Sequence, residues 1–147
     1  MKSAEIIGFP LKNKTDNSET PKLSEILGAD FASRVRSKAA ARQLDGTIPT
    51  DIFLDEMILV WGERGYGNTV TDKLKECWMG ILDCFNRSLG GPGLNISSAT
   101  MGAGKTTTAL ICLAIHYVLY PADGSIMVCR RIEECDEAME ALNDLFG

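Results

Sequence analysis

Residues 99–106 read Ala-Thr-Met-Gly-Ala-Gly-Lys-Thr, which is the spacing of a loop that binds phosphate, with alanine in place of the first glycine. Gly102 and Gly104 permit backbone torsions, and a close approach of the main chain to an anion, that a Cβ would block. Successive backbone N–H groups could then point at a phosphate, and a helix that begins near Lys105 would direct its positive end toward the same group. The pattern therefore predicts a nucleotide-binding loop.

Two side chains would complete such a site. Lys105 would place a positive charge beside the β- and γ-phosphates, and the hydroxyl of Thr106 would ligate Mg²⁺. The expected cofactors are ATP and Mg²⁺, and the residues expected to contact the nucleotide are Thr100, Met101, Gly102, Ala103, Gly104, Lys105, Thr106 and Thr107. The alternative is a glycine-rich turn between a strand and a helix, with an exposed lysine and no ligand.

A loop of this kind needs a strand before it and a helix after it, and the sequence predicts both. Residues 94–99 have the composition of a short strand, and residues 105–120 form a helix that is apolar almost all round and must be buried on most sides. A turn, a second strand over 125–130 and a helix over 132–146 follow. The order strand, helix, strand, helix is typical of an α/β fold with a parallel sheet.

The rest of the chain divides into two parts. Residues 1–20 are polar and are expected to form a flexible leader. Residues 21–70 are expected to be a mostly helical N-terminal region, with helices over 22–44 and 51–61. An amphipathic helix over 71–87 then opens the predicted P-loop domain, which would occupy residues 71–147.

Composition limits the function classes. The chain has 147 residues, 45% of them apolar and 24% charged, which suits one ordinary globular domain and excludes wholesale disorder. The net charge of −5 argues against a protein that coats nucleic acid by bulk charge. The first residues lack the apolar core of a signal peptide, and the most apolar stretch is too short to cross a membrane. We therefore expect a cytoplasmic protein without a membrane partner.

Several chemically capable side chains are better explained by packing. The five cysteines are odd in number and contain no Cys-x-x-Cys pair, so we expect buried free thiols rather than disulfides or a zinc site. His116, the only histidine, lies within the apolar helix and is expected in the core or at its rim. Trp61 and Trp78 are expected to pack rather than to stack on bases.

The form Ala-x-x-Gly-x-Gly-Lys-Thr at residues 99–106 resembles motif I of superfamily-two helicases and related translocases, and the resemblance covers residues 71–147. It implies a RecA-like P-loop parallel sheet, an ATPase activity and a DNA or RNA partner. In that family the segment after the second strand contacts the nucleic-acid backbone, and here it would be Arg130 and Arg131.

The sequence also departs from that family. The family reads adenine with an upstream glutamine, whereas the only glutamine here, Gln43, lies in another expected helix. No later strand ending in an acidic pair follows, and the pairs Asp55-Glu56 and Asp136-Glu137 both lie within helical patterns. We therefore expect an incomplete domain that binds ATP without hydrolysing it, the rest of the core coming from missing sequence or another chain.

Two other function classes stay open at this point. The same loop occurs in other P-loop enzymes, such as packaging-motor ATPases and small-molecule kinases, although a kinase lid would need arginines and only Arg130 and Arg131 follow the loop. The second class is a non-enzymatic interaction module that binds a nucleotide without hydrolysis.

Overall fold

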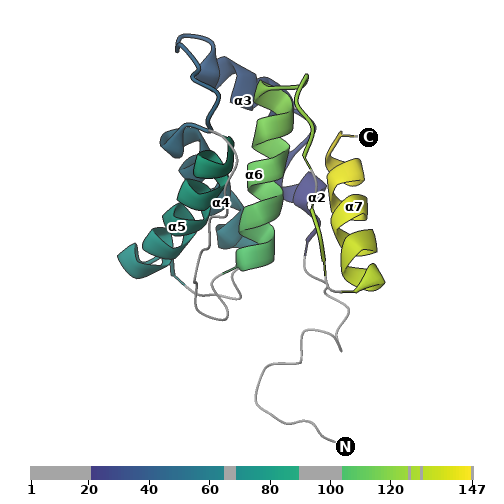
Figure 1. Cartoon of the computed structure of the whole chain (residues 1–147). Helices are drawn as coiled ribbons and strands as arrows, with labels where there is room; N and C mark the ends of the chain where they lie inside the picture. The colour runs from purple at the N-terminus through teal and green to yellow at the C-terminus, as the bar shows by residue number, and fades with distance from the viewer. Residues whose placement is uncertain (1–20, 65–68, 90–103, 126, 130, 147) are drawn as a thin grey trace, which may run out of the picture.

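The structure is a computed structural model that describes residues 21–64, 69–89, 104–125, 127–129 and 131–146, and these residues contain six helices (Figure 1). In chain order the helices are α2 (Leu23–Leu27), α3 (Phe31–Ala39), α4 (Thr50–Arg64), α5 (Asp72–Leu89), α6 (Lys105–Leu119) and α7 (Ile132–Phe146). None of the described residues belongs to a strand.

Helix α6 runs through the middle of the molecule, with α4 and α5 on one side and α2 and α7 on the other (Figure 1). It packs against α3, α4, α5 and α7. Its sequence explains the position, because a helix that is apolar all round is stable only when other elements cover most of its surface. The apolar side chains that it buries are Leu110, Ile111, Cys112, Ala114, Ile115 and Val118.

The prediction of an α/β fold with a RecA-like parallel sheet is wrong for the part of the chain that the structure describes. The first expected strand, 94–99, lies outside that part. Of the second, 125–130, residues 125 and 127–129 are described and lie in neither a helix nor a strand. A strand needs a neighbour for its backbone groups, and none of the described segments provides one. The elements that cover α6 are the helices α3, α4, α5 and α7 and not the expected sheet.

The N-terminal segment differs from the expected single helix over 22–44. Gly28 has a φ of 83° and ends α2, and α3 begins only at Phe31. Left-handed torsions of this kind favour glycine, so this residue breaks the periodic pattern into two helices. Helix α5 begins after Thr71, whose Oγ1 accepts a hydrogen bond from the backbone N of Leu74 at 3.1 Å and so caps the helix.

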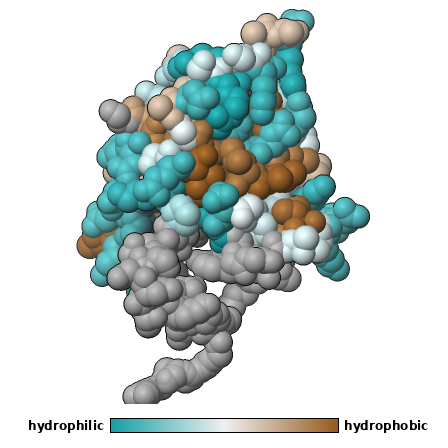
Figure 2. All heavy atoms as spheres, turned by 180° about the vertical axis from the view of Figure 1, so that it is seen from behind, coloured by the Kyte–Doolittle hydropathy of each residue, from teal (hydrophilic) through white to brown (hydrophobic). Residues whose placement is uncertain are grey.

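The buried apolar side chains form one cluster to which all six helices contribute, among them Phe31, Phe53, Trp78, Ile115 and Ala138. Some apolar surface remains exposed, and from behind it gathers in the middle of the face, surrounded by hydrophilic surface (Figure 2). No helix in the described ranges is both long and apolar enough to cross a membrane.

Candidate functional site

Gly104, the last glycine of the predicted phosphate-binding loop, directly precedes α6. Gly104 has φ 79° and ψ 39°, the left-handed conformation, and the helix begins at the next residue, Lys105. The Gly104 carbonyl accepts hydrogen bonds from the backbone N of Thr108 at 2.8 Å and from its Oγ1 at 2.7 Å. The first turn is therefore closed at Gly104, and the N-terminal end of α6 is fixed at this residue.

The first turn of α6 carries no negative charge that would compete with an anion. No acidic residue lies in this turn, and no side chain of the described segments caps the helix. Lys105 and Thr106 are exposed, Thr107 is half-buried and Thr108 is buried. The lysine and the first threonine are therefore open to a ligand that approaches the helix end.

Trp61 of α4 lies directly behind Gly104. A Cβ placed on Gly104 would lie 2.9 Å from Cζ3 of this tryptophan and 3.6 Å from its Cε3. Trp61 as a whole is 9% exposed, and its ring meets that of Trp78 on α5 edge-on, with ring centroids 5.5 Å apart. Both tryptophans therefore pack, as expected from the sequence, and one of them packs against the predicted loop.

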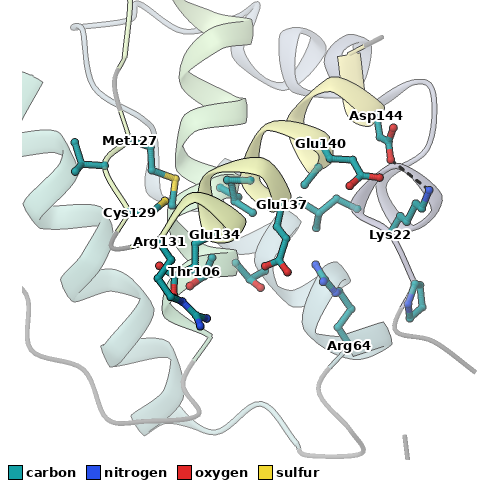
Figure 3. A pocket seen from close by; sticks show the side chains of 17 residues that line it. Lys22, Arg64, Thr106, Met127, Cys129, Arg131, Glu134, Glu137, Glu140 and Asp144 are labelled. Carbon is teal, nitrogen blue, oxygen red and sulfur yellow. Dashed lines mark ion pairs between the residues drawn. The ribbon is translucent and has the colours of Figure 1, made fainter. Parts of the chain in front are cut away.

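A cavity of about 830 Å³ borders the first turn of α6 on the side of α7 (Figure 3). Thr106, Thr107 and Leu110 of α6 line one side of it, and the segment containing Met127 and Cys129 lines another. Helix α7 contributes Glu134, Glu137, Ala138, Glu140, Ala141 and Asp144, and the remaining lining residues include Lys22, Arg64 and Arg131.

Charges of both signs face this cavity. Arg131 Nε lies 3.4 Å from Glu134 Oε2, and Lys22 Nζ lies 3.5 Å from Asp144 Oδ2. Arg64 extends into the cavity from the α4 side (Figure 3). The α7 carboxylates that line the cavity repel a phosphate group that carries no metal ion. An anion is therefore favoured only near the positive end of α6.

The structure places part of the predicted nucleotide site. Gly104, Lys105, Thr106 and Thr107 lie together at the end of α6, whereas Thr100, Met101, Gly102 and Ala103 lie outside the described residues. Arg130 also lies outside them. Arg131 is exposed and lines the same cavity as Thr106.

The acidic pair Asp55-Glu56 is not a free catalytic pair. Glu56 is buried against Arg34, and Asp55 Oδ2 lies 3.1 Å from Lys38 Nζ. Of the other pair, Asp136 and Glu137 are exposed on α7, and only Glu137 lines the cavity. Both carboxylates of the first pair therefore have structural partners.

The prediction of five buried thiols is wrong in part. Cys112 is buried, whereas Cys77, Cys84 and Cys129 are half-buried and Cys135 is exposed. Cys77, Cys84 and Cys135 lie on helices, where the apolar stripe read from the sequence is broader than the face that the helix buries, and Cys129 lies outside any helix. His116 is 2% exposed, as expected of a core histidine.

Nothing in the described segments forms a ready-made metal centre, since no group of three or more His, Cys, Asp or Glu side chains is arranged to hold an ion. The exposed Thr106 hydroxyl in the first turn of α6 fits the role of a single protein ligand to Mg²⁺ carried by a nucleotide. Three features of the site could not be predicted from the sequence. They are the packing of Trp61 against Gly104, the positions of Lys22 and Arg64 in the lining of the cavity, and the α7 carboxylates that face it. All three depend on contacts between segments far apart in the chain.

No family model matches the chain, and comparisons with curated proteins and with solved structures find no similar protein.

Proposed function

We propose that this chain binds the phosphate groups of a nucleoside triphosphate, with Mg²⁺, at the N-terminal end of α6, and that residues 100–107 form the binding loop. The observation that carries the proposal is the left-handed Gly104 placed directly before a buried helix that begins at Lys105. ATP is the expected nucleotide. The left-handed conformation occurs at Gly104, a position at which the phosphate-binding motif has glycine.

Electrostatics supports an anion at this position. The N-terminal end of a helix carries about half a positive charge, and its first N–H groups have no partner within the helix. Helix α6 has no acidic residue in its first turn, and Lys105 adds a full positive charge beside it. A β- or γ-phosphate would therefore meet backbone donors and the lysine together.

Thr106 has the position and chemistry to hold the metal ion. Its hydroxyl is exposed in the first turn of α6 and borders the cavity that α7 lines with carboxylates. Bound Mg²⁺ would supply charge neutralisation for the triphosphate. Because the α7 wall is acidic, a nucleotide that carries Mg²⁺ is favoured over the free nucleotide.

The proposal is restricted to binding. The helicase-like assignment implied a parallel sheet, and the described residues are helical instead. Contact of DNA or RNA with Arg130 and Arg131 stays a prediction from the resemblance, and the Arg131 guanidinium already lies beside Glu134. Hydrolysis is not proposed, because Asp55 and Glu56 are engaged in structural ion pairs.

Calorimetric titration with Mg-ATP tests the proposal on the whole chain. We expect the wild type to bind and Lys105→Ala to lose at least about tenfold in affinity, or ~1.4 kcal/mol. Lys73→Ala is the matched control, because Lys73 is an exposed lysine in the first turn of α5. Equal affinities of the wild type and Lys105→Ala, with unchanged helical circular dichroism, would overturn the assignment.

A further inference from the structure

We propose that Trp61 of α4 is a positioning residue for the phosphate site at the start of α6, holding Gly104 in the left-handed conformation from which the helix begins. This inference rests on the proposed function and extends it to a residue outside the motif. It is carried by the close contact between the indole ring and the glycine, and by the immobility of that ring.

The contact leaves no space for a side chain at position 104. A Cβ there would lie 2.9 Å from Cζ3, 3.6 Å from Cε3 and 3.9 Å from Cη2 of Trp61. A φ of +79° already disfavours any residue with a Cβ. Gly104 is therefore required for two independent reasons, one belonging to its own backbone and one to the tryptophan behind it.

The ring that makes this contact is packed against a second tryptophan in the core. Trp61 is 9% exposed, and its neighbour Trp78 is fully buried on α5. The two rings meet edge-on at 63°, an arrangement that aromatic pairs favour. Closely packed interiors allow little displacement of a large side chain. The indole is thus a rigid wall where α4, α5 and the start of α6 meet.

A rigid wall at this point affects binding as well as stability. Backbone N–H groups bind an anion well when they are oriented before the ligand arrives, because little ordering is then needed on binding. Gly104 cannot shift toward α4 while the indole is in place. A smaller side chain at position 61 would open that space, and the amides of Gly104 and Lys105 would lose their fixed direction.

The indole N–H is a separate property of the same side chain. Nε1 is buried and has no hydrogen-bond partner among the described residues. The atoms nearest to Gly104, Cζ3 and Cε3, belong to the six-membered ring and not to the nitrogen-bearing ring. Trp61→Phe keeps an aromatic ring without the N–H, whereas Trp61→Leu removes the wall, so the two variants separate these properties.

The experiment must distinguish a role of Trp61 in positioning Gly104 from a general role in core packing. Mg-ATP titrations compare the wild type, Lys105→Ala, Trp61→Phe, Trp61→Leu and Phe53→Leu, with thermal unfolding measured for each. Phe53 is a fully buried aromatic residue on the same helix and serves as the matched core control. We expect Trp61→Leu to weaken binding by about tenfold, Trp61→Phe to weaken it less, and Phe53→Leu to lower the melting temperature without changing the affinity.

A spectroscopic measurement supplements the titrations and does not depend on the leucine variant. The chain has two tryptophans, so Trp61 is the only one left in Trp78→Phe. We expect Mg-ATP to change the emission of Trp61 in that variant and to leave Trp78 emission in Trp61→Phe almost unchanged. If Trp61→Leu does not fold, the affinity of Trp61→Phe for Mg-ATP and the emission of Trp61 in Trp78→Phe test the positioning role.

The possible results separate the two proposals. Failure of the wild type to bind Mg-ATP would overturn both. Binding that Lys105→Ala abolishes, but that Trp61→Leu or Trp61→Phe leaves at the wild-type affinity with silent Trp61 emission, would overturn the positioning role alone. A loss in Phe53→Leu equal to that in Trp61→Leu would also overturn it, because general loosening of α4 would then explain the effect.

Discussion

Arg34 of α3 and Glu56 of α4 form a bidentate ion pair at the edge of the helical core, where the arginine is partly exposed and the carboxylate is buried. Arg34 Nε donates to Glu56 Oε2 at 3.1 Å, and Nη2 donates to Oε1 at 2.7 Å. Glu56 is 1% exposed, and its hydrogen bond raises the pKa of the arginine. The same guanidinium donates to the Leu27 carbonyl at 3.0 Å. The Arg34 guanidinium therefore links the end of α2 and the first turn of α3 to a buried carboxylate in the middle of α4.

Removal of the arginine should destabilise the fold strongly. In Arg34→Met the buried Glu56 carboxylate keeps only the longer contact with Lys38 Nζ, at 3.5 Å. A buried charge that loses its main partner destabilises a protein by about 3–5 kcal/mol. The remaining contact with Lys38 should reduce this destabilisation. We expect urea unfolding to show a reduction of about 2–4 kcal/mol in the free energy of unfolding.

Arg36→Met is the matched control for this prediction, since Arg36 is an exposed arginine on the same helix. It should change the free energy of unfolding by no more than about 0.5 kcal/mol. Equal unfolding curves for the two variants would show that the ion pair does not contribute to stability.

Tyr120 fixes the loop between α3 and α4. Its hydroxyl donates to the Thr47 carbonyl at 2.6 Å and accepts from the Gly46 backbone N at 3.1 Å. We expect Tyr120→Phe to lower the free energy of unfolding by about 1–2 kcal/mol, because both backbone groups lose this partner. Hydrogen exchange at the Gly46 amide should become faster in the variant, whereas Tyr117→Phe, at an exposed tyrosine, should leave it unchanged. Unchanged exchange in Tyr120→Phe would show that the hydroxyl does not hold the loop.

Helix positions near the site follow from local signals in the sequence. The expected helix over 132–146 coincides with α7, and the expected start at Lys105 is the start of α6. Apolar residues recur at helical spacing in α7, whereas α6 is apolar almost all round and follows Gly104 directly. Gly104 through Thr107 are consecutive, so their meeting at one helix end needs no tertiary information.

The fold class depends on contacts that the sequence pattern does not specify. The apolar character of α6 predicts burial, but it says nothing of whether a sheet or other helices cover it. Short apolar segments such as 125–130 are compatible with strands only if a distant segment pairs with them. The contact of Trp61 with Gly104, and the lining of the cavity by Lys22, Arg64 and α7, likewise join segments far apart in the chain.

Cys112 provides a test of whether α6 is enclosed as described. Burial raises the pKa of its thiol from 9.0 to about 12. The thiolate is the reactive form, so at pH 8 Cys112 should resist iodoacetamide in the folded protein, while the exposed Cys135 reacts. The same shift predicts that this thiol's contribution to stability is complete below pH 9 and is lost as the pH rises toward 12. Peptide mass spectrometry after timed iodoacetamide labelling, with a urea-unfolded sample as the control, measures the reaction of Cys112 and of Cys135. Labelling of Cys112 as fast as Cys135 in the folded protein would show that α6 is open to solvent.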